Sequence, residues 1–128
     1  MSTLFTKILR GEIPCYKVYE DEKHFAFLTI EPSSRGHTLL VPKREVDKWT
    51  DLTKQEVQDI FTVAQTLSKT LEKKCEVKRV CLIIAGFLVP HVHLHLIPSN
   101  SEEDMKLENG KLASKEELSN VLSIITSP

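Results

Sequence analysis

The chain has 128 residues, with 17 basic and 18 acidic side chains and a net charge of −1, and a chain of this length fits one domain. This balance argues against a protein that coats a nucleic-acid polymer, because such proteins usually carry a marked basic excess. No stretch approaches the roughly 18 apolar residues that cross a membrane, and the first residues lack the apolar core of a signal peptide. We therefore expect a cytoplasmic protein with no membrane partner and no polymeric nucleic-acid partner.

The first part of the chain predicts a short helix followed by three strands. Residues 4–10 place apolar side chains on one side of a helix, and a glycine follows it. The stretches 16–20 and 24–30 are typical of strands joined by a tight hairpin. A turn rich in serine then leads into a third apolar strand over 37–42, with the sequence HTLLVP.

The second part alternates long helical and short apolar segments. Thr53 and Glu56 form a capping box that opens a helix reaching to about Lys74, with apolar residues at three- and four-residue steps. Strands are expected over 79–85 and 91–97, and a second capping box at Ser114 predicts a helix over about 115–126. The class is therefore α+β with a largely antiparallel sheet. We expect a single domain over 1–128, with the core in 1–98 and a C-terminal extension in 99–128.

Three of the five histidines fall in one stretch, VPHVHLHLIP, which spans residues 89–98. In a strand alternate side chains face opposite ways, so His91, His93 and His95 share one face, about 6.5–7 Å apart at neighbouring roots. The aliphatic residues between them face the other way, towards a core.

Three interpretations of this histidine face compete. It could be a polar strand facing solvent, or part of a zinc site, since histidines two residues apart can both bind zinc. It could also carry acid–base and nucleophilic chemistry at a phosphate, because imidazole serves as nucleophile and as acid near neutral pH. Gly86, just upstream, lets a turn approach an anion closely, which favours the third interpretation.

The run HVHLHLI resembles the motif that names the histidine triad (HIT) superfamily, in its Hint/Fhit-like branch of nucleotide hydrolases and transferases. The upstream blocks GEIP and GHTLLVPK are similar to the family in the same order. The resemblance implies a HIT-like fold, with a five-stranded antiparallel sheet, one long and several short flanking helices, and a C-terminal helix. It also implies a homodimer that needs no cofactor or metal.

The resemblance further implies attack on the α-phosphate of a nucleoside phosphoramidate, an acyl-nucleotide or a dinucleoside polyphosphate, through a nucleotidyl-histidine intermediate. By position, His93 is the nucleophile, His95 assists the leaving group, and His91 orients His93 partly through its main-chain carbonyl. The remaining expected contacts bind the substrate. They are His37 near the phosphate, Thr29 and Ile30 at the ribose, Phe5, Ile8 and Ile13 around the base, and the backbone of Leu88 and Val89 at the phosphate.

The chain departs from the family pattern at several positions. Thr29 stands where many members have a ribose-binding aspartate, and apolar Phe87 and Leu88 replace polar residues before the triad. These substitutions motivate an alternative function, a nucleotide-binding or interaction dimer with weak or vestigial catalysis. Glu45 replaces a fourth histidine, and the stretch Thr3-Leu4-Phe5-Thr6 replaces the cysteine pair that binds zinc in some relatives, which argues against a metal.

Overall fold

The protein is described here from a computed structural model, which covers residues 2–128. Its five strands form one sheet in the order β1-β2-β3-β5-β4, and every neighbouring pair is antiparallel. The elements in chain order are α1 (Leu4–Leu9), β1 (Tyr16–Glu20), β2 (His24–Leu28), β3 (Thr38–Pro42), η1 (Trp49–Asp51), α2 (Lys54–Lys74), β4 (Arg79–Ile83), β5 (Leu94–Ser99), η2 (Glu102–Met105), η3 (Leu107–Asn109) and α3 (Lys115–Thr126). The predicted α+β class and the five-stranded antiparallel sheet are confirmed.

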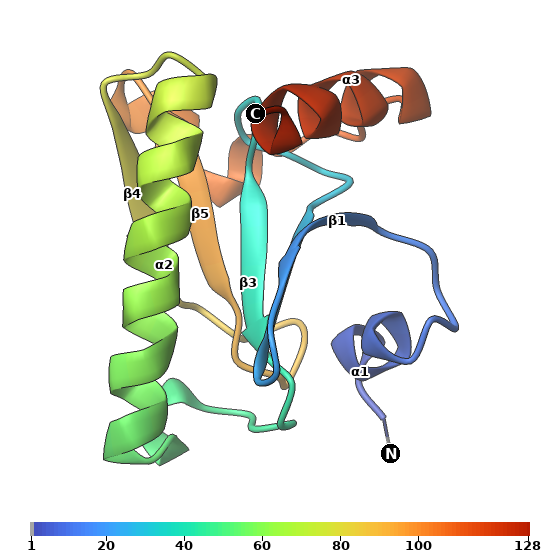
Figure 1. Cartoon of the computed structure of the whole chain (residues 1–128), viewed down its shortest axis with the longest axis vertical. Coiled ribbons are helices and arrows are strands. Elements are labelled where there is room, and N and C mark those ends of the chain that lie inside the picture. Colours follow the sequence, from blue (N-terminus) through green and yellow to red (C-terminus); the bar gives the residue numbers. More distant parts are fainter. Residues whose placement is uncertain (1) are drawn as a thin grey trace.

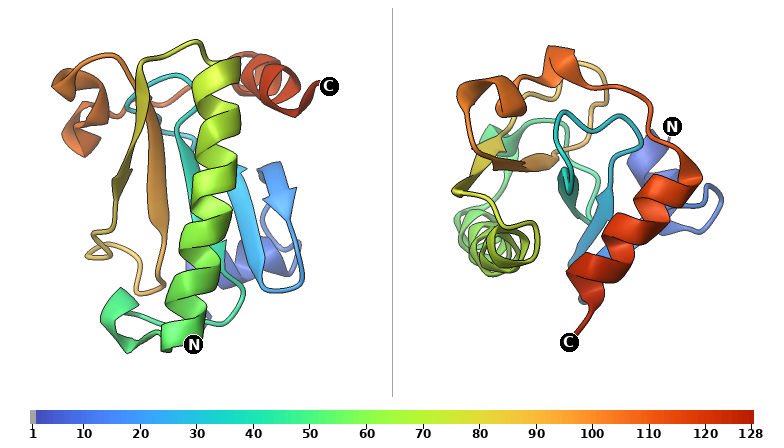
Figure 2. Two further views of the ribbon diagram at one scale, coloured as in Figure 1. Left: turned by 60° about the vertical axis from the view of Figure 1, so that its left-hand side comes forward. Right: turned by 90° about the horizontal axis from the view of Figure 1, so that it is seen from above.

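Helices cover both faces of this sheet. In Figure 1, α2 runs along one face and α3 crosses the upper end, and Figure 2 shows α1 on the side away from α2. Buried side chains of α2 and α3 pack with alternate residues of the strands in the larger apolar cluster. A smaller cluster joins α1 to the opposite face of β2 and β3. Both strands are buried along their whole length, because each has a layer on either side.

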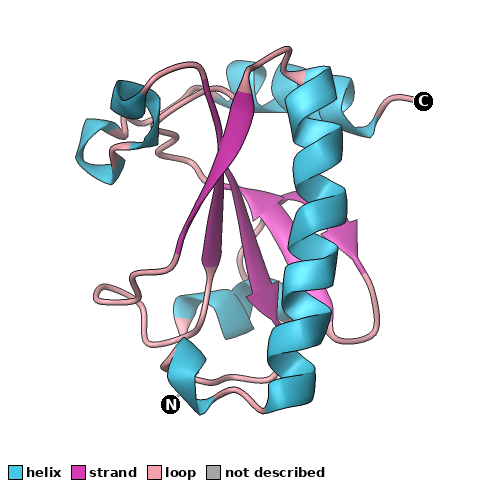
Figure 3. Cartoon of the chain, turned by 90° about the vertical axis from the view of Figure 1, so that its left-hand side faces the viewer, coloured by secondary structure: helices cyan, strands magenta, loops and turns pink. Residues whose placement is uncertain are grey.

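The predicted helix boundaries are close to the observed ones. The α2 capping box is complete, since the Thr53 hydroxyl accepts from the Glu56 amide and the Glu56 carboxylate accepts from the Thr53 amide. At α3 the Ser114 hydroxyl accepts from the amide of Glu117. The polar segment after the sheet, which the sequence left unassigned, forms η2 and η3, at the end of the sheet shown at the upper left of Figure 3.

The strand ends differ from prediction in one respect that matters for function. The expected strand over 91–97 begins only at Leu94 and runs on to Ser99. Upstream of it, Pro90 has no amide hydrogen to donate, and the Val92 amide bonds to the carbonyl of Val46 instead of to a neighbouring strand. His91 and His93 therefore lie in an extended entry to β5, and His95 is the member of the triad inside the strand.

Candidate active site

The alternation that the sequence predicts persists through this entry segment. Val92, Leu94 and Leu96 are at most 1% exposed and belong to the core cluster under α2 and α3. The histidines face the opposite side, where the Phe5 ring lies 5.7 Å from the ring of His91 and 4.8 Å from that of His93. The structure thus places the triad on the face of the sheet that α1 partly covers.

His93 is held through one ring nitrogen and is open at the other. Its Nδ1 lies 2.7 Å from the main-chain carbonyl oxygen of His91. A carbonyl can only accept, so Nδ1 carries the hydrogen and the neutral ring keeps its lone pair on Nε2. No residue within 2–128 forms a hydrogen bond with that Nε2. The predicted contact with the His91 carbonyl is present, and the orienting role of His91 stays a prediction.

His95 is oriented by a second chain of hydrogen bonds. The amide of Ser33 donates to Nδ1 of His37 at 3.1 Å, which leaves the hydrogen of the neutral His37 ring on Nε2. That Nε2 lies 3.0 Å from Nδ1 of His95 and donates to it. The neutral His95 ring must then carry its own hydrogen on Nε2. His93 therefore presents a lone pair, and His95 presents a donor.

Burial keeps these rings uncharged. Desolvation, helped by the neighbouring His95, lowers the pKa of His37 to about 3. Desolvation, helped by His93, lowers the pKa of His95 to about 4. The pKa of His93 is also lowered, mainly by burial, although its bond to the His91 carbonyl opposes the shift. The row thus offers neutral imidazoles at physiological pH, the form required of a nitrogen nucleophile.

The unpaired nitrogen of His93 is accessible, and His93 lines a cavity. His93 is only 7% exposed, but within residues 2–128 no buried side-chain nitrogen or oxygen lacks a hydrogen-bond partner, so its unpaired Nε2 must touch accessible space. His93 also lines a cavity of about 480 Å³ beneath the loop that contains Gly86, with Trp49 on its wall. Gly86 has a φ of +82°, as its predicted turn requires.

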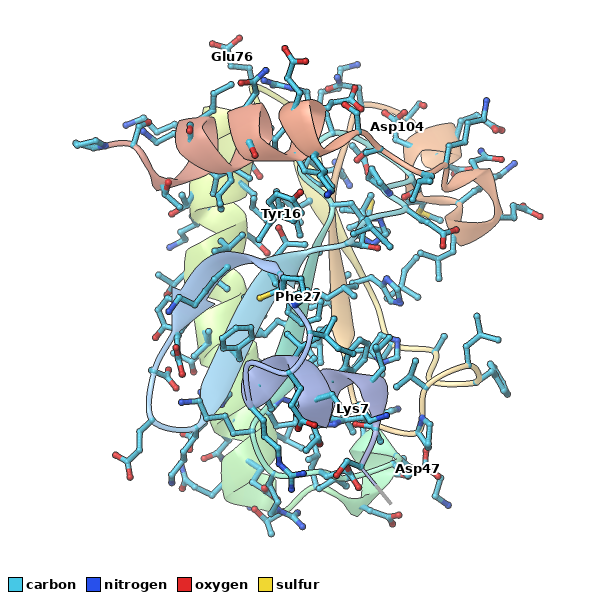
Figure 4. All side chains as sticks on the ribbon, turned by 90° about the vertical axis from the view of Figure 1, so that its right-hand side faces the viewer. Lys7, Tyr16, Phe27, Asp47, Glu76 and Asp104 are labelled. Atoms are coloured by element: carbon cyan, nitrogen blue, oxygen red, sulfur yellow. The ribbon has the colours of Figure 1, made fainter. Side chains whose placement is uncertain are left out.

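Apolar residues flank the row on the α1 side. Phe5 and Ile8 are buried in the smaller cluster with Phe27, whose ring lies 5.7 Å from Phe5, and Figure 4 shows Phe27 beside α1. Ile13 and Val89 are partly buried against the same cluster. The structure thus brings four of the predicted substrate contacts together, with Phe5 against His93. The role of Phe5, Ile8 and Ile13 around a base, and that of the Val89 backbone at the phosphate, stay predictions.

Three other predicted substrate contacts are more exposed than His91 and His93. The side chain of Leu88 is 96% exposed, and that of Ile30 is 54% exposed. The Thr29 hydroxyl accepts a local hydrogen bond from the Glu31 amide at 3.2 Å. Thr29 lines a separate cavity of about 260 Å³ with His37 and residues of α3. The roles of Thr29 and Ile30 at the ribose, and of the Leu88 and Val89 backbone at the phosphate, stay predictions.

The sequence analysis missed the partners that fix His91. This ring is fully buried, with Nε2 2.8 Å from the carbonyl oxygen of Pro42 and Nδ1 2.8 Å from the hydroxyl of Thr3. One signal could have identified Thr3, because a threonine directly before the first helical residue is a typical N-cap. Its contact with a residue 88 positions away could not be read from the sequence.

Between residues 2 and 128 no group of three or more histidine, cysteine or acidic side chains is arranged to hold a metal ion. The same part of the chain contains no helix of the length and apolar character needed to cross a membrane. The three cysteines are free thiols.

Comparison with known proteins agrees with this geometry. The sequence matches the HIT domain over residues 10–102. It is 38% identical over 104 residues to an adenosine 5'-monophosphoramidase of Schizosaccharomyces pombe, covering 80% of this chain and 78% of that protein.

Solved structures show the same fold. A HIT-like protein from Bartonella henselae, described as involved in cell-cycle regulation, has a TM-score of 0.85 at 26% identity, covering 97% of this chain and 94% of that one. A zinc-bound histidine triad protein from Mycobacterium smegmatis has a TM-score of 0.81 at 28% identity, covering 98% and 94%. With the triad, the sheet and the sequence match in agreement, the chain belongs to the histidine triad (HIT) family.

Proposed function

We propose that the protein is a nucleotide hydrolase or transferase that acts at the α-phosphate of a nucleoside monophosphate bearing a leaving group, through a nucleotidyl-His93 intermediate. The observation that carries this proposal is the opposite polarity of two adjacent rings. His93 directs a lone pair into accessible space, and His95, with ring centroids 5.0 Å apart, carries a hydrogen on its Nε2. One ring can attack phosphorus while the other donates a hydrogen bond to the group that leaves.

In the first step, Nε2 of His93 forms a bond to the α-phosphorus, and the bond from phosphorus to the leaving group breaks. The Nε2–H of His95 donates a hydrogen bond to the departing nitrogen or oxygen, which takes its proton from solvent, so His95 stays neutral. The His93 ring becomes positively charged, and the His91 carbonyl, 2.7 Å from Nδ1, stabilises that charge.

In the second step, water attacks the same phosphorus and releases its proton to solvent, while the Nε2–H of His95 donates a hydrogen bond at the phosphate. The phosphorus–nitrogen bond breaks, and the His93 ring returns to its starting state with release of the nucleoside monophosphate. A different acceptor in place of water would make the reaction a transfer.

We propose a nucleoside phosphoramidate as the first substrate to examine. A leaving amine gains most from the hydrogen-bond donor on His95, because an amide anion is a very poor leaving group and its negative charge must be neutralised as it departs. The S. pombe relative is named as an adenosine 5'-monophosphoramidase, so adenosine phosphoramidate is the first compound, followed by the guanosine analogue, an acyl-adenylate and a dinucleoside polyphosphate.

Trapping of the intermediate tests the proposal. Acid-labile label from an α-phosphate-labelled substrate is expected on the protein, and His93→Gly is expected to remove both label and turnover. His24→Gln is the matched control, because His24 is a buried histidine outside the triad that forms a hydrogen bond with Asp21. This variant should retain both the label and turnover.

The exposed loop at Phe87 and Leu88 supports a second candidate function. Phe87 and Leu88 are 95% and 96% exposed, so their side chains offer no polar group to a phosphate. Ordinary nucleotide affinity without turnover or label in the wild-type protein would contradict the enzymatic proposal and support a binding dimer with weak catalysis.

We also propose that the protein is a homodimer. Strand β4 lies at the edge of the sheet, and Leu82 within it is 38% exposed. An exposed strand edge favours pairing with a second strand. Light scattering during size-exclusion chromatography should give twice the mass of one chain, and a monomer mass at micromolar concentration would contradict this.

A further inference from the structure

The buried ring of His91 is connected to an exposed carboxylate on another segment of the chain. Its Nδ1 lies 2.8 Å from Oγ1 of Thr3. Oε1 of Glu45 accepts both the amide of Thr3, at 2.9 Å, and the hydroxyl of Thr6, at 2.6 Å. Three segments that are far apart in sequence therefore meet in one set of hydrogen bonds: the start of α1, the loop after β3 and the entry to β5.

The carbonyl of Pro42 decides which group donates and which accepts at the His91 ring. The carbonyl of Pro42 can only accept, so Nε2 of the neutral His91 ring carries the hydrogen and Nδ1 must accept. The hydroxyl of Thr3 is then the donor to Nδ1, while its oxygen accepts the amide of Thr6 at 3.2 Å. The hydroxyl of Thr6 donates to Glu45. The Thr3 hydroxyl also lies 3.3 Å from Oγ1 of Thr6, a longer contact than the 2.8 Å to Nδ1 of His91, and the carbonyl of Pro42 fixes the tautomer of that ring.

We infer that Glu45 is a positioning residue of the active site, which acts through Thr3 and Thr6 to hold His91 and, through the His91 carbonyl, the nucleophile His93. This inference rests on the proposed function for its catalytic part. Glu45 does not touch the reacting atoms. It determines where the start of α1 lies, and so where the Thr3 hydroxyl meets the ring.

The charge on Glu45 strengthens this set of bonds. The hydrogen bonds from Thr6 and Thr3 lower the pKa of Glu45 to about 2, so it is a carboxylate at any working pH. Hydrogen bonds to an ionised acceptor are stronger than neutral ones. The carboxylate also restrains a helix of only six residues, which has little stability of its own, and Phe5 on that helix packs against His91 and His93.

The chain contains a matched control. Glu56 has the same relation to the N-cap of α2 as Glu45 has to that of α1: its carboxylate accepts the amide of Thr53, and its pKa is also about 2. The side chain of Glu56 bonds to Arg44 and to Thr53, and to no histidine within residues 2–128. A purely structural role predicts the same result for both carboxylates, whereas a positioning role separates them.

The test compares Glu45→Ala and Thr3→Val with Glu56→Ala and Thr53→Val. The first readout is the ¹⁵N resonance of the His91 ring, measured without substrate. Thr3→Val and Glu45→Ala should move the Nδ1 signal towards that of an unbonded nitrogen, and the two controls should leave it in place. The conservative variants Thr3→Ser and Glu45→Gln, which keep a donor and an acceptor, should restore most of the wild-type signal.

The second readout is turnover of the phosphoramidate substrate. Thr3→Val and Glu45→Ala should lower kcat about five- to tenfold, the effect of losing one hydrogen bond that orients the nucleophile, with KM within about twofold. Equal kcat and unchanged ¹⁵N signals in these variants would overturn the inference, as would controls that lower kcat equally. If the wild-type protein has no turnover, the proposed function fails, and the ¹⁵N readout alone decides whether Glu45 positions His91.

Discussion

The buried, neutral His37 predicts that the protein loses stability on mild acidification. His37 is 3% exposed, and its folded-state pKa is about 3, whereas a histidine in an unfolded chain titrates near 6.5. The unfolded chain therefore takes up a proton that the folded chain refuses, and the free energy of unfolding falls as the pH drops below about 6.5. Between about pH 7.5 and about pH 5, His37 alone should cost about 2 kcal/mol.

Urea unfolding at the two pH values measures this loss, and His37→Gln isolates it. Glutamine does not titrate, and its amide can still donate to Nδ1 of His95. The pH-dependent loss should therefore be about 2 kcal/mol smaller in the variant than in the wild type. The carboxylates of Glu45 and Glu56 add little over this range, because their stabilisation is lost mainly below about pH 4.5. Equal losses in the two proteins would show that His37 is not held neutral by burial, and would refute the reasoning.

Two further predictions concern the scaffold. Gly36→Ala should lower the free energy of unfolding by about 2–4 kcal/mol, since φ is +91° and a Cβ would lie 2.6 Å from Sγ of Cys75. Gly11→Ala is the control, because φ is +77° there but nothing lies within 4 Å of the added Cβ, and it should cost only about 1–2 kcal/mol in the same denaturation assay. Equal costs in the two variants would contradict the predicted clash with Cys75. Thr53→Ala should lower the stability of α2 by about 1 kcal/mol through loss of its N-cap hydrogen bond. Thr66→Ala, on the exposed face of the same helix, should change the thermal midpoint little. A similar drop in the thermal midpoint of both variants would argue against a stabilising cap at Thr53.

Much of the fold could be predicted from local chemistry. The Thr53 capping box and the apolar steps of α2 are signals within a few residues of one another, and they identified a helix that ends where expected, at Lys74. The predicted strand over 91–97 was partly wrong, since β5 begins only at Leu94. The start of a strand depends on which backbone groups find a hydrogen-bond partner. The amide of Val92 bonds to Val46, and nothing in the local sequence specifies that pairing.

The candidate site could likewise be predicted from the sequence only in part. The triad could be read from the sequence, because alternation is a local property and places His91, His93 and His95 on one face. The resemblance correctly predicted the bond from His93 to the His91 carbonyl. The exposure of Leu88 and Ile30 could not be predicted, since it depends on which segments pack over them.

By itself, the sequence determined that this chain carries a row of imidazoles that share one face at a strand of an antiparallel sheet, because side-chain periodicity acts over a few residues; only the structure showed that β5 begins at Leu94, so that His95 alone of the triad lies within it. Only the tertiary structure decided the protonation pattern of that row. A neutral imidazole has two possible tautomers, and the choice at each ring depends on partners from distant segments: Ser33 for His37, His37 for His95, and Thr3 with Pro42 for His91. Folding brings those donors and acceptors to the rings, and so decides which nitrogen keeps a lone pair and which one carries a hydrogen.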